Sequence, residues 1–241
     1  MSKTYIIFGA SRGLGDAFAQ GLPEKGDKVY LLSRSLPRSI DLLDDGVERI
    51  WLQTDLSDYK QASIVKEKLK DEVIDIIIYN VGIWEKRGFE DDYDFEQDEP
   101  EDIAYLIQTN VASPIIFLQS LLPHIKRADN GKIILIGSTD GLENNQSTQV
   151  SFVASKFSIR GMAHALREHL REENISVTCV NPGNLAAEIP YEKGTKVALE
   201  TYGSERIPVQ DIVSIVKTIL SLSQSTAIKE INMPAMKDMN V

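Results

Sequence analysis

The chain has 241 residues, which is enough for one domain with a large buried core. Its 26 basic and 36 acidic residues give a formal net charge of −10, which disfavours a nucleic acid or an anionic membrane as the main partner. A single cysteine, Cys179, excludes a disulfide within the chain. No signal-peptide pattern precedes the first strand-like residues and no apolar stretch approaches a membrane span, so we expect a cytoplasmic protein.

Short apolar runs alternate with helical patterns along most of the chain, which is typical of βαβ units. The strand-like runs are Tyr5–Phe8, Lys28–Ser33, Arg49–Thr54, Ile74–Tyr79, Lys132–Gly137, Ser176–Asn181 and Glu230–Met233. The helical patterns are Gly13–Lys25, a short one at Pro37–Leu43, Asp58–Lys70, Glu101–Arg127, Gln149–Glu172 and Val209–Leu222. Because right-handed crossovers place helices on both faces of a parallel sheet, we predict an α/β fold: a single doubly wound Rossmann-type domain over residues 1–241, with a seven-stranded parallel sheet.

Residues 90–102 form a dense acidic run between the fourth strand and the next helix. We interpret it as a solvated loop whose carboxylates favour the start of that helix. An acidic wall beside a cationic substrate is the weaker alternative, because selectivity for a cation needs converging ligands that this pattern does not specify.

The first strand runs into the glycine-rich turn Gly9-Ala-Ser-Arg-Gly-Leu-Gly15 and then into the first helix. Gly9 permits a sharp turn, Gly13 lets the backbone approach a pyrophosphate, and Gly15 lets the helix pack closely on the sheet. The N-terminus of the helix then directs its N–H groups at the phosphates. This turn predicts a dinucleotide site. Its expected contacts are Gly9, Ser11, Arg12, Gly13, Leu14 and Gly15.

The spacing Gly-x-x-x-Gly-x-Gly resembles that of the short-chain dehydrogenase/reductase family, and further matches extend the resemblance over nearly the whole chain. They are Asp55 in Thr54-Asp-Leu-Ser57, Asn80 in Asn80-Val-Gly82, Asn110, Ser138, Lys156 and Asn181-Pro-Gly183. The resemblance implies an oxidoreductase acting on a small carbonyl compound or alcohol, with substrate loops at about 183–208. It also implies a homodimer or homotetramer paired through the two long helices.

By the same resemblance, Asp55 accepts a hydrogen bond from the adenine amino group, which suits a carboxylate. Asp55 as a cap for the helix that starts near Asp58 stays open as an alternative or an additional role. Asn80 lines the ribose pocket, although its neighbours Tyr79 and Val81 depart from the family pattern. Further expected cofactor contacts are Leu56, Gly82, Lys156, Pro182 and Gly183.

The residues after the second strand favour NADP(H) over NAD(H). An NAD site usually has an acidic residue there for the ribose 2′-hydroxyl, whereas this strand ends Leu31-Leu-Ser-Arg34. Arg12 lies in the glycine-rich turn, so two guanidinium groups are available for a 2′-phosphate. Two surface arginines without a ligand are the alternative.

The family uses a serine, a tyrosine and a lysine, the last two in a Tyr-x-x-x-Lys element that places both side chains on one helix face. Here Ser151-Phe-Val-Ala-Ser-Lys156 aligns with that element, so Phe152 occupies the tyrosine position. The resemblance assigns the substrate oxygen to Ser138, the nicotinamide ribose to Lys156 and a proton relay to Asn110. Phenylalanine cannot exchange a proton, and a general acid or base typically contributes roughly 10²–10⁴ in rate.

Three interpretations of Phe152 stay open. The protein uses another proton donor, such as Tyr191, Tyr202 or a water held by Ser138; or it is a variant inactivated by a Tyr→Phe change; or it is a catalytically silent NADP(H)-binding regulatory or scaffold protein. Retention of the other catalytic residues favours the oxidoreductase, although Lys156 would also persist for ribose binding alone.

A second departure from the family is Ala187, where members commonly carry a threonine that bonds the nicotinamide carboxamide. Residues expected to make the substrate cavity partly apolar are Trp84, Leu142, Leu185, Ile189 and Tyr191. No metal site is predicted, because His164 and His169 are five residues apart and lack the i, i+4 spacing of a metal pair.

Overall fold

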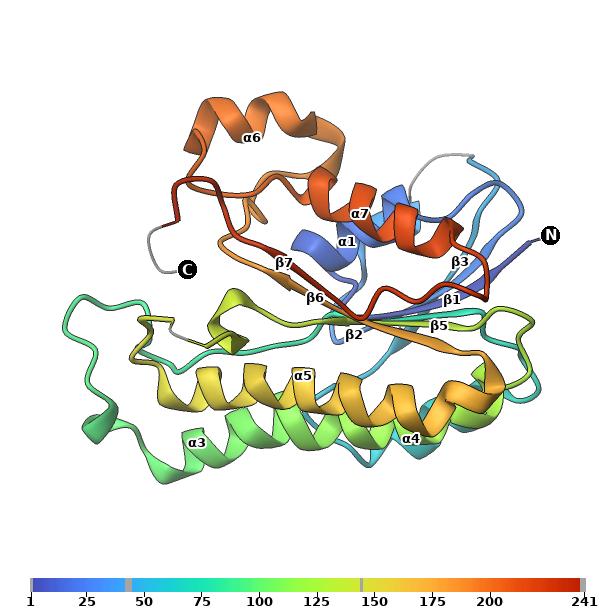
Figure 1. Cartoon of the computed structure of the whole chain (residues 1–241), viewed down its shortest axis with the longest axis horizontal. Helices are drawn as coiled ribbons and strands as arrows, with labels where there is room; N and C mark the ends of the chain where they lie inside the picture. Colours follow the sequence, from blue (N-terminus) through green and yellow to red (C-terminus); the bar gives the residue numbers. More distant parts are fainter. Residues whose placement is uncertain (1, 42–44, 144, 239–241) are drawn as a thin grey trace.

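The computed structural model describes residues 2–41, 45–143 and 145–238. Its strands form one parallel sheet in the order β3-β2-β1-β4-β5-β6-β7, which confirms the predicted seven-stranded, doubly wound fold (Figure 1). The strands are β1 (Thr4–Phe8), β2 (Lys28–Ser33), β3 (Glu48–Gln53), β4 (Ile76–Tyr79), β5 (Lys132–Ile136), β6 (Ser176–Pro182) and β7 (Glu230–Met233). The direction of winding reverses at β1, which pairs with both β2 and β4, so a ligand crevice is expected at their carboxyl ends.

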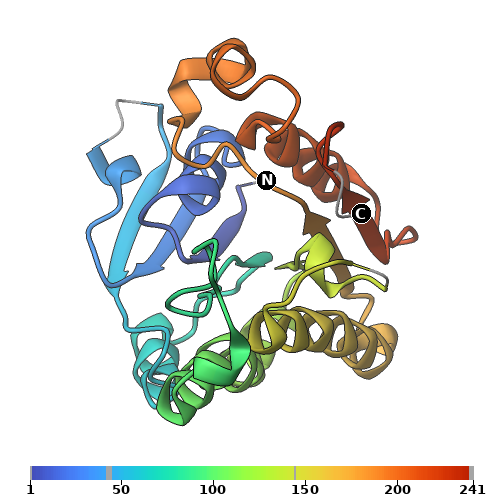
Figure 2. The same cartoon turned by 90° about the vertical axis from the view of Figure 1, so that its left-hand side faces the viewer.

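The helices cover both faces of the sheet, as Figures 1 and 2 show. They are α1 (Gly13–Gly21), α2 (Gln61–Leu69), α3 (Pro100–Ile107), α4 (Ser113–Ile125), α5 (Val150–Leu170), α6 (Gly194–Tyr202) and α7 (Val209–Ser221). The first helix and α7 share one core with alternate strand residues such as Ile7 and Ile78. The helices α2, α4 and α5 share the other with Ile6 and Ile77. Burial on both faces is what makes these strands apolar throughout.

Several predicted helices end elsewhere than the sequence pattern indicates. The first helix stops at Gly21 instead of Lys25, because Pro23 has no N–H group with which to continue it. The helix α2 starts at Gln61 instead of Asp58. The Asp58 carboxylate accepts a hydrogen bond from the Lys60 N–H in a turn that precedes the helix. Of the short helix predicted at 37–43, the structure has a 3₁₀ turn at Arg38–Asp41, and residues 42 and 43 lie outside the described part.

The predicted helix over 101–127 is divided by a π-helical turn, η3 (Gln108–Ala112), which joins α3 to α4. There the Ser113 N–H donates to the Gln108 carbonyl five residues earlier. Pro114 follows and has no N–H for the carbonyl of Asn110. The sequence pattern of one continuous helix therefore did not indicate the wider π-helical turn that contains Asn110, a candidate site residue.

The segment expected to form only loops after Gly183 contains a further helix, α6. Ala198 is its one buried residue, so little of this helix packs in the core. Gly194 and Gly203, both with positive φ, lie at its two ends.

The run Pro100–Ile125 is 26 residues long with a mean hydropathy of 1.2 in its most apolar window, enough by length and composition to cross a membrane. The expectation that no stretch approaches a span is therefore wrong. However, 44% of that window is buried in the structure, and Phe117, Leu118 and Leu121 of α4 pack in the core. The apolar character of the run accordingly matches a helix that packs against a sheet.

Replacing Phe117 by alanine is expected to lower the free energy of unfolding by about 3–5 kcal/mol, because the change leaves a cavity in the core. Its ring is fully buried and meets the Phe8 ring edge-on at 5.4 Å. Urea denaturation followed by circular dichroism measures the loss. The control is Ile115→Ala on the same helix, a half-exposed position where we expect less than about 1 kcal/mol. Equal losses in the two variants would contradict this packing.

Candidate active site and cofactor cleft

A cavity of about 840 Å³ opens at the carboxyl ends of the central strands. Most of the predicted site residues line it, although they come from distant parts of the sequence. These are Gly9, Ser11, Arg12, Leu14, Arg34, Asp55, Leu56, Asn80, Gly82, Ser138, Phe152, Lys156, Pro182 and Gly183. Three predicted residues, Gly13, Gly15 and Asn110, are absent from the lining in the described part of the chain. The cavity therefore joins the glycine-rich turn to the Ser138–Phe152–Lys156 group.

Two glycines of the turn allow main-chain contacts that a side chain would block. Gly9 has φ = +73°, and a Cβ there would lie 2.2 Å from the Asn80 carbonyl oxygen. A Cβ at Gly15 would lie 2.0 Å from the Gly9 carbonyl oxygen. Gly15 thus lets the first turn of α1 press against the end of β1, as the sequence predicted.

The N-terminus of α1 has the form of an anion site. Arg12 is the N-cap residue, with extended backbone and no side-chain hydrogen bond to the first turn. The terminal N–H groups of the helix are therefore not capped by that side chain and lie beside the cavity that Ser11 and Arg12 line.

Two arginines and an aspartate line the cavity at the end that contains the glycine-rich turn. Arg12 and Arg34 are exposed, and in the described part of the chain neither guanidinium makes a hydrogen bond or ion pair. Burial opposes the ionisation of Asp55, but two hydrogen bonds from Ser57 and the charge of Arg34 outweigh it and lower the pKa of Asp55. Both donors belong to Ser57, which lies ahead of α2, so the Asp55 carboxylate does not cap that helix.

Lys156 is buried at the other end of the cavity. Its Nζ donates to the Gly137 carbonyl at 3.3 Å, and a Cβ at Gly82 would lie 3.1 Å from the same nitrogen. Burial lowers the pKa of Lys156 to about 8. The ammonium group is thus held at the cavity wall, close to the segment that follows β4.

Phe152, at the predicted position one turn before Lys156, carries no hydroxyl and is almost fully buried. Its ring stacks on Trp84 with centroids 5.2 Å apart, and Trp84 meets Phe89 at 5.7 Å. The Lys156 Nζ lies 5.2 Å from the Phe152 ring centroid. Phe152 therefore begins a row of three aromatic rings, all of which line the cavity.

Asn110 braces the segment after β4. Its side chain donates to the Ile83 carbonyl and to Ser155 Oγ, at 2.8 and 3.0 Å, and accepts from the Ile83 N–H at 2.9 Å. These contacts hold the π-helical turn against that segment and against α5.

The start of α5 is fixed by a carboxylate that sequence analysis missed. Glu85 Oε1 accepts a hydrogen bond from the Phe152 N–H at 2.9 Å, and the Gln149 amide donates to the Gly88 carbonyl. Glu85 Oε2 is buried and has no hydrogen-bond partner in the described structure. No local pattern signals this contact, because it joins residues 67 positions apart.

The two tyrosines considered as replacement donors lie outside the cavity lining. Tyr191 packs in the core against α1, near Gly21. Tyr202 lies beneath the Arg206 guanidinium, 4.3 Å from its ring centroid. The titratable group found beside Ser138 is instead Asp140, whose Oδ2 accepts a hydrogen bond from Ser138 Oγ at 2.9 Å. Sequence analysis also missed Asp140, although the Ser-x-Asp spacing permits such a local contact.

The acidic segment 90–102 behaves as the solvated loop expected from its sequence. Arg87 pairs with Glu90 and Asp92, and Lys86 pairs with Asp102. Asp94 caps a short 3₁₀ turn, η2 (Phe95–Gln97). None of the residues 90–102 lines the cavity, so the alternative of an acidic substrate wall is wrong for this structure.

The apolar part of the cavity differs from that expected. Trp84 and Leu185 line it, whereas Leu142, Ile189 and Tyr191 do not. Ala187, at the position of the family threonine, is also part of the lining. Among the described residues, no group of three or more histidine, cysteine, aspartate and glutamate side chains could hold a metal ion.

The sequence profile described as short chain dehydrogenase matches residues 3–197, and the chain belongs to this family of oxidoreductases. The 3-oxoacyl-(acyl-carrier-protein) reductase FabG of Aggregatibacter actinomycetemcomitans is 29% identical over 222 residues, which cover 90% of this chain and 84% of the relative. The 3-dehydrosphinganine reductase TSC10B of Arabidopsis thaliana is 30% identical over 188 residues, or 73% of this chain and 53% of that protein.

Solved structures share the fold. The alcohol dehydrogenase from the archaeon Thermococcus sibiricus, complexed with 5-hydroxy-NADP, has a TM-score of 0.80 at 20% identity, covering 99% of this chain and 98% of that chain. A metagenomic short-chain oxidoreductase in complex with NADP has a TM-score of 0.76 at 24% identity, covering 98% of each chain. Proteins of this fold therefore include enzymes that hold a nicotinamide cofactor.

Replacing Lys156 by methionine is expected to stabilise the protein at pH 7, because it removes a buried charge. The folded state releases the Lys156 proton near pH 8, whereas the unfolded chain keeps it until about pH 10.5. The stability of the unchanged protein therefore rises with pH across this window, and the advantage of the variant, on the order of 1–3 kcal/mol at pH 7, shrinks toward pH 10. Denaturant titrations at pH 7, 8.5 and 10 measure it. A pH-independent difference would contradict the lowered pKa.

Proposed function

We propose that this protein is an NADP(H)-dependent oxidoreductase that interconverts a small carbonyl compound and its alcohol. One observation carries the proposal: a single cavity extends from Arg12 and Arg34 to Ser138, Phe152 and Lys156. The residues along it fit a phosphorylated dinucleotide. At its proposed adenosine end, the start of α1 has no side-chain cap, and within the described residues the guanidinium groups of Arg12 and Arg34 make no hydrogen bond or ion pair.

In this proposal the binding tasks are divided along the cavity. Arg12 and Arg34 hold the 2′-phosphate, the N–H groups at the start of α1 bind the pyrophosphate, and Asp55 accepts from the adenine amino group. Lys156 donates to the nicotinamide ribose, and Ser138 contacts the substrate oxygen. When bound, the nicotinamide supplies the hydride chemistry. The preference for NADP(H) is supported by the absence of an acidic residue at the end of β2, where Ser33 is followed by Arg34.

The row of aromatic rings supports an apolar substrate. Phe89 and Trp84 are exposed at the cavity, beyond the buried Phe152, and offer flat surfaces to a carbonyl compound with an apolar or aromatic substituent. Because one relative is named as a 3-oxoacyl-(acyl-carrier-protein) reductase, a β-keto ester is a suitable first probe.

Phe152 and Ala187 favour a second candidate function, a catalytically silent NADP(H)-binding regulatory or scaffold protein. Both positions lack the polar group that the family pattern carries, while the adenosine end retains its charged residues. This candidate makes the same binding prediction and differs only in turnover.

We further propose a cytoplasmic homodimer or homotetramer that pairs through α4 and α5. The half-exposed side chains Ile115 on α4 and Phe157 on α5 are the apolar groups that such a contact would cover. Light scattering of the full chain determines the oligomeric state.

Replacing both Arg12 and Arg34 by alanine is expected to raise the Kd for NADPH about 10- to 100-fold, because charge-assisted hydrogen bonds to the 2′-phosphate are lost. The Kd for NADH should change less than about threefold, since NADH lacks that phosphate. Titration of nucleotide fluorescence measures both constants. Arg38→Ala is the control, because Arg38 pairs with Glu192 outside the cavity lining. Equal weakening of both nucleotides would contradict the preference.

Replacing Phe152 by tyrosine is expected to raise kcat with NADPH and ethyl acetoacetate by about 10²–10⁴, because the phenol supplies a proton donor beside the substrate oxygen. The Kd for NADPH should stay the same. Phe157→Tyr, on the exposed side of α5, is the matched control.

The unchanged protein and the Phe152→Tyr variant are also compared with benzaldehyde and with a quinone as substrates. NADPH binding without turnover in either form would favour the silent protein, and absence of NADPH binding would overturn both candidates.

A further inference from the structure

The wall of the cavity beside Phe152 contains a hydrogen-bonded pair, Ser138 and Asp140. The Ser138 hydroxyl donates to Asp140 Oδ2 at 2.9 Å, and the Asp140 N–H donates to Ser138 Oγ at 3.1 Å. Both residues line the cavity, together with Phe152 and Lys156. The serine that the proposed function places on the substrate oxygen is thus already joined to a carboxylate.

The direction of these bonds determines which further hydrogen bond the Ser138 hydroxyl can form. Its one O–H hydrogen is donated to Asp140, and one of its two oxygen lone pairs accepts from the Asp140 N–H. In the described structure no hydrogen bond engages the second lone pair. Ser138 Oγ can therefore accept one more hydrogen bond, and the O–H group of a substrate alcohol can donate it.

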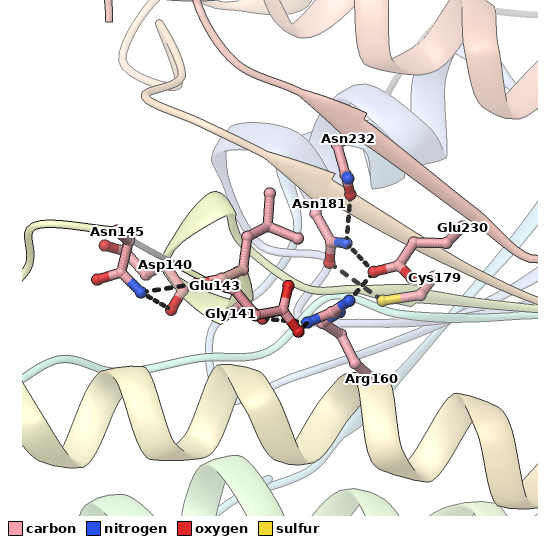
Figure 3. Close-up of polar contacts among 10 residues, drawn as sticks. Asp140, Gly141, Glu143, Asn145, Arg160, Cys179, Asn181, Glu230 and Asn232 are labelled. Carbon is pink, nitrogen blue, oxygen red and sulfur yellow. Dashed lines mark hydrogen bonds and ion pairs between the residues drawn. The ribbon is translucent and has the colours of Figure 1, made fainter. Parts of the chain in front are cut away.

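Hydrogen bonds from two side chains to main-chain carbonyls hold the segment that carries Asp140. Asn145 donates its side-chain amide to the carbonyls of Asp140 and Leu142, at 3.0 and 2.9 Å. Arg160 donates to the Gly141 carbonyl at 2.9 Å, one turn beyond Lys156 on α5. Figure 3 shows these contacts on both sides of the segment.

Arg160 is itself anchored to the sheet. Its Nε donates to Glu230 on β7 at 2.6 Å, and Glu230 also accepts from the Asn181 amide at 2.7 Å (Figure 3). The segment with Asp140 is consequently held against both α5 and the sheet, which suits a group that must keep its position during a reaction.

A buried ammonium group lies near the pair. Lys156 lies close enough for its ammonium group to attract Asp140. Arg206 lines the same cavity, but its guanidinium group forms an ion pair with Glu188.

We propose that Asp140, acting through Ser138, accepts the substrate proton in place of the missing tyrosine. This inference rests on the proposed oxidoreductase function and assigns its proton path. Tyr191 and Tyr202 are outside the cavity, so they offer no alternative hydroxyl.

The step balances as follows for an alcohol and NADP⁺. The alcohol O–H proton passes to Ser138 Oγ as the Ser138 hydroxyl proton passes to the Asp140 carboxylate. A bound oxidised nicotinamide would accept the hydrogen and electron pair of the carbinol C–H bond as hydride, and the electron pair of the broken O–H bond would form the C=O bond. The Asp140 carboxylic acid then returns its proton to water. Reduction follows the same steps in reverse, with the carboxylic acid as the proton source.

The test compares Asp140→Asn and Asp140→Glu in two backgrounds, the unchanged protein and Phe152→Tyr. The asparagine amide oxygen still accepts from Ser138, so D140N removes the base and retains a hydrogen-bond acceptor. Glu143→Gln is the control, because Glu143 lies on the same segment, pairs with Arg160 and is outside the cavity lining. The reaction is oxidation of ethyl 3-hydroxybutyrate or 1-phenylethanol by NADP⁺. NADPH fluorescence titration and thermal melting provide readouts independent of turnover.

In the unchanged background, D140N should lower kcat about 100-fold or more while D140E retains activity within about tenfold, because only a carboxylate accepts the proton. In the Phe152→Tyr background, D140N should lower kcat less than about fivefold, since the phenol takes over the proton. The Kd for NADPH and the melting temperature should be unchanged in both.

Equal losses from D140N in both backgrounds would overturn the inference, because Asp140 would then only orient Ser138. Turnover by Phe152→Tyr without any by the unchanged protein would also overturn it, and would leave the oxidoreductase scaffold intact. Absence of turnover in both backgrounds with normal NADPH binding would reject the proposed enzyme function and this proton path with it.

Discussion

The close approach of α1 to the end of β1 is the constraint on which the cofactor end of this molecule depends. Gly15 lies so near the Gly9 carbonyl, and Gly9 so near the Asn80 carbonyl, that any side chain at either position would collide with main chain. This contact joins the first strand, the first helix and the segment after β4 in one rigid corner. The start of α1, to which its N-cap residue Arg12 makes no side-chain hydrogen bond, consequently lies beside the cavity that Arg12 and Arg34 line.

The reactive end depends on α5 in a comparable way. Glu85 holds its first turn through the Phe152 N–H, and Arg160 ties its middle to the segment containing Asp140 and to β7. Phe152 is at the first attachment, and Lys156 lies between it and Arg160. Because α5 is held at both places, Phe152 and Lys156 keep their positions relative to Ser138, which follows β5. Such positioning is what a proton transfer over hydrogen-bond distances requires.

The chemistry proposed at Ser138 depends on Phe152 and on Asp140. The Phe152 ring stacks on Trp84 and lies 5.2 Å from the Lys156 Nζ, but it carries no hydroxyl that could exchange a proton. The pair of Ser138 and Asp140 offers a carboxylate within one hydrogen bond of the place where the substrate oxygen is proposed to bind. The proposed site therefore combines a cofactor end that resembles its family with a reactive end that would use different groups.

The sequence by itself determined the seven strands, their parallel arrangement, the glycine-rich corner and the position of Phe152. These depend on local causes: apolar runs buried on both faces, glycines required by close main-chain contact, and residues one helical turn apart. It did not reveal the π-helical turn around Asn110, the helix α6, the distance of Tyr191 from the cavity, or the roles of Glu85 and Asp140. Those were decided by tertiary structure, because each depends on which distant segments pack together, as when Glu85 meets Phe152 across 67 positions. The close contact between Gly15 and Gly9 could be predicted since both lie within seven residues of sequence, whereas the proposed proton path depends on side-chain orientations that only the packed cavity defines.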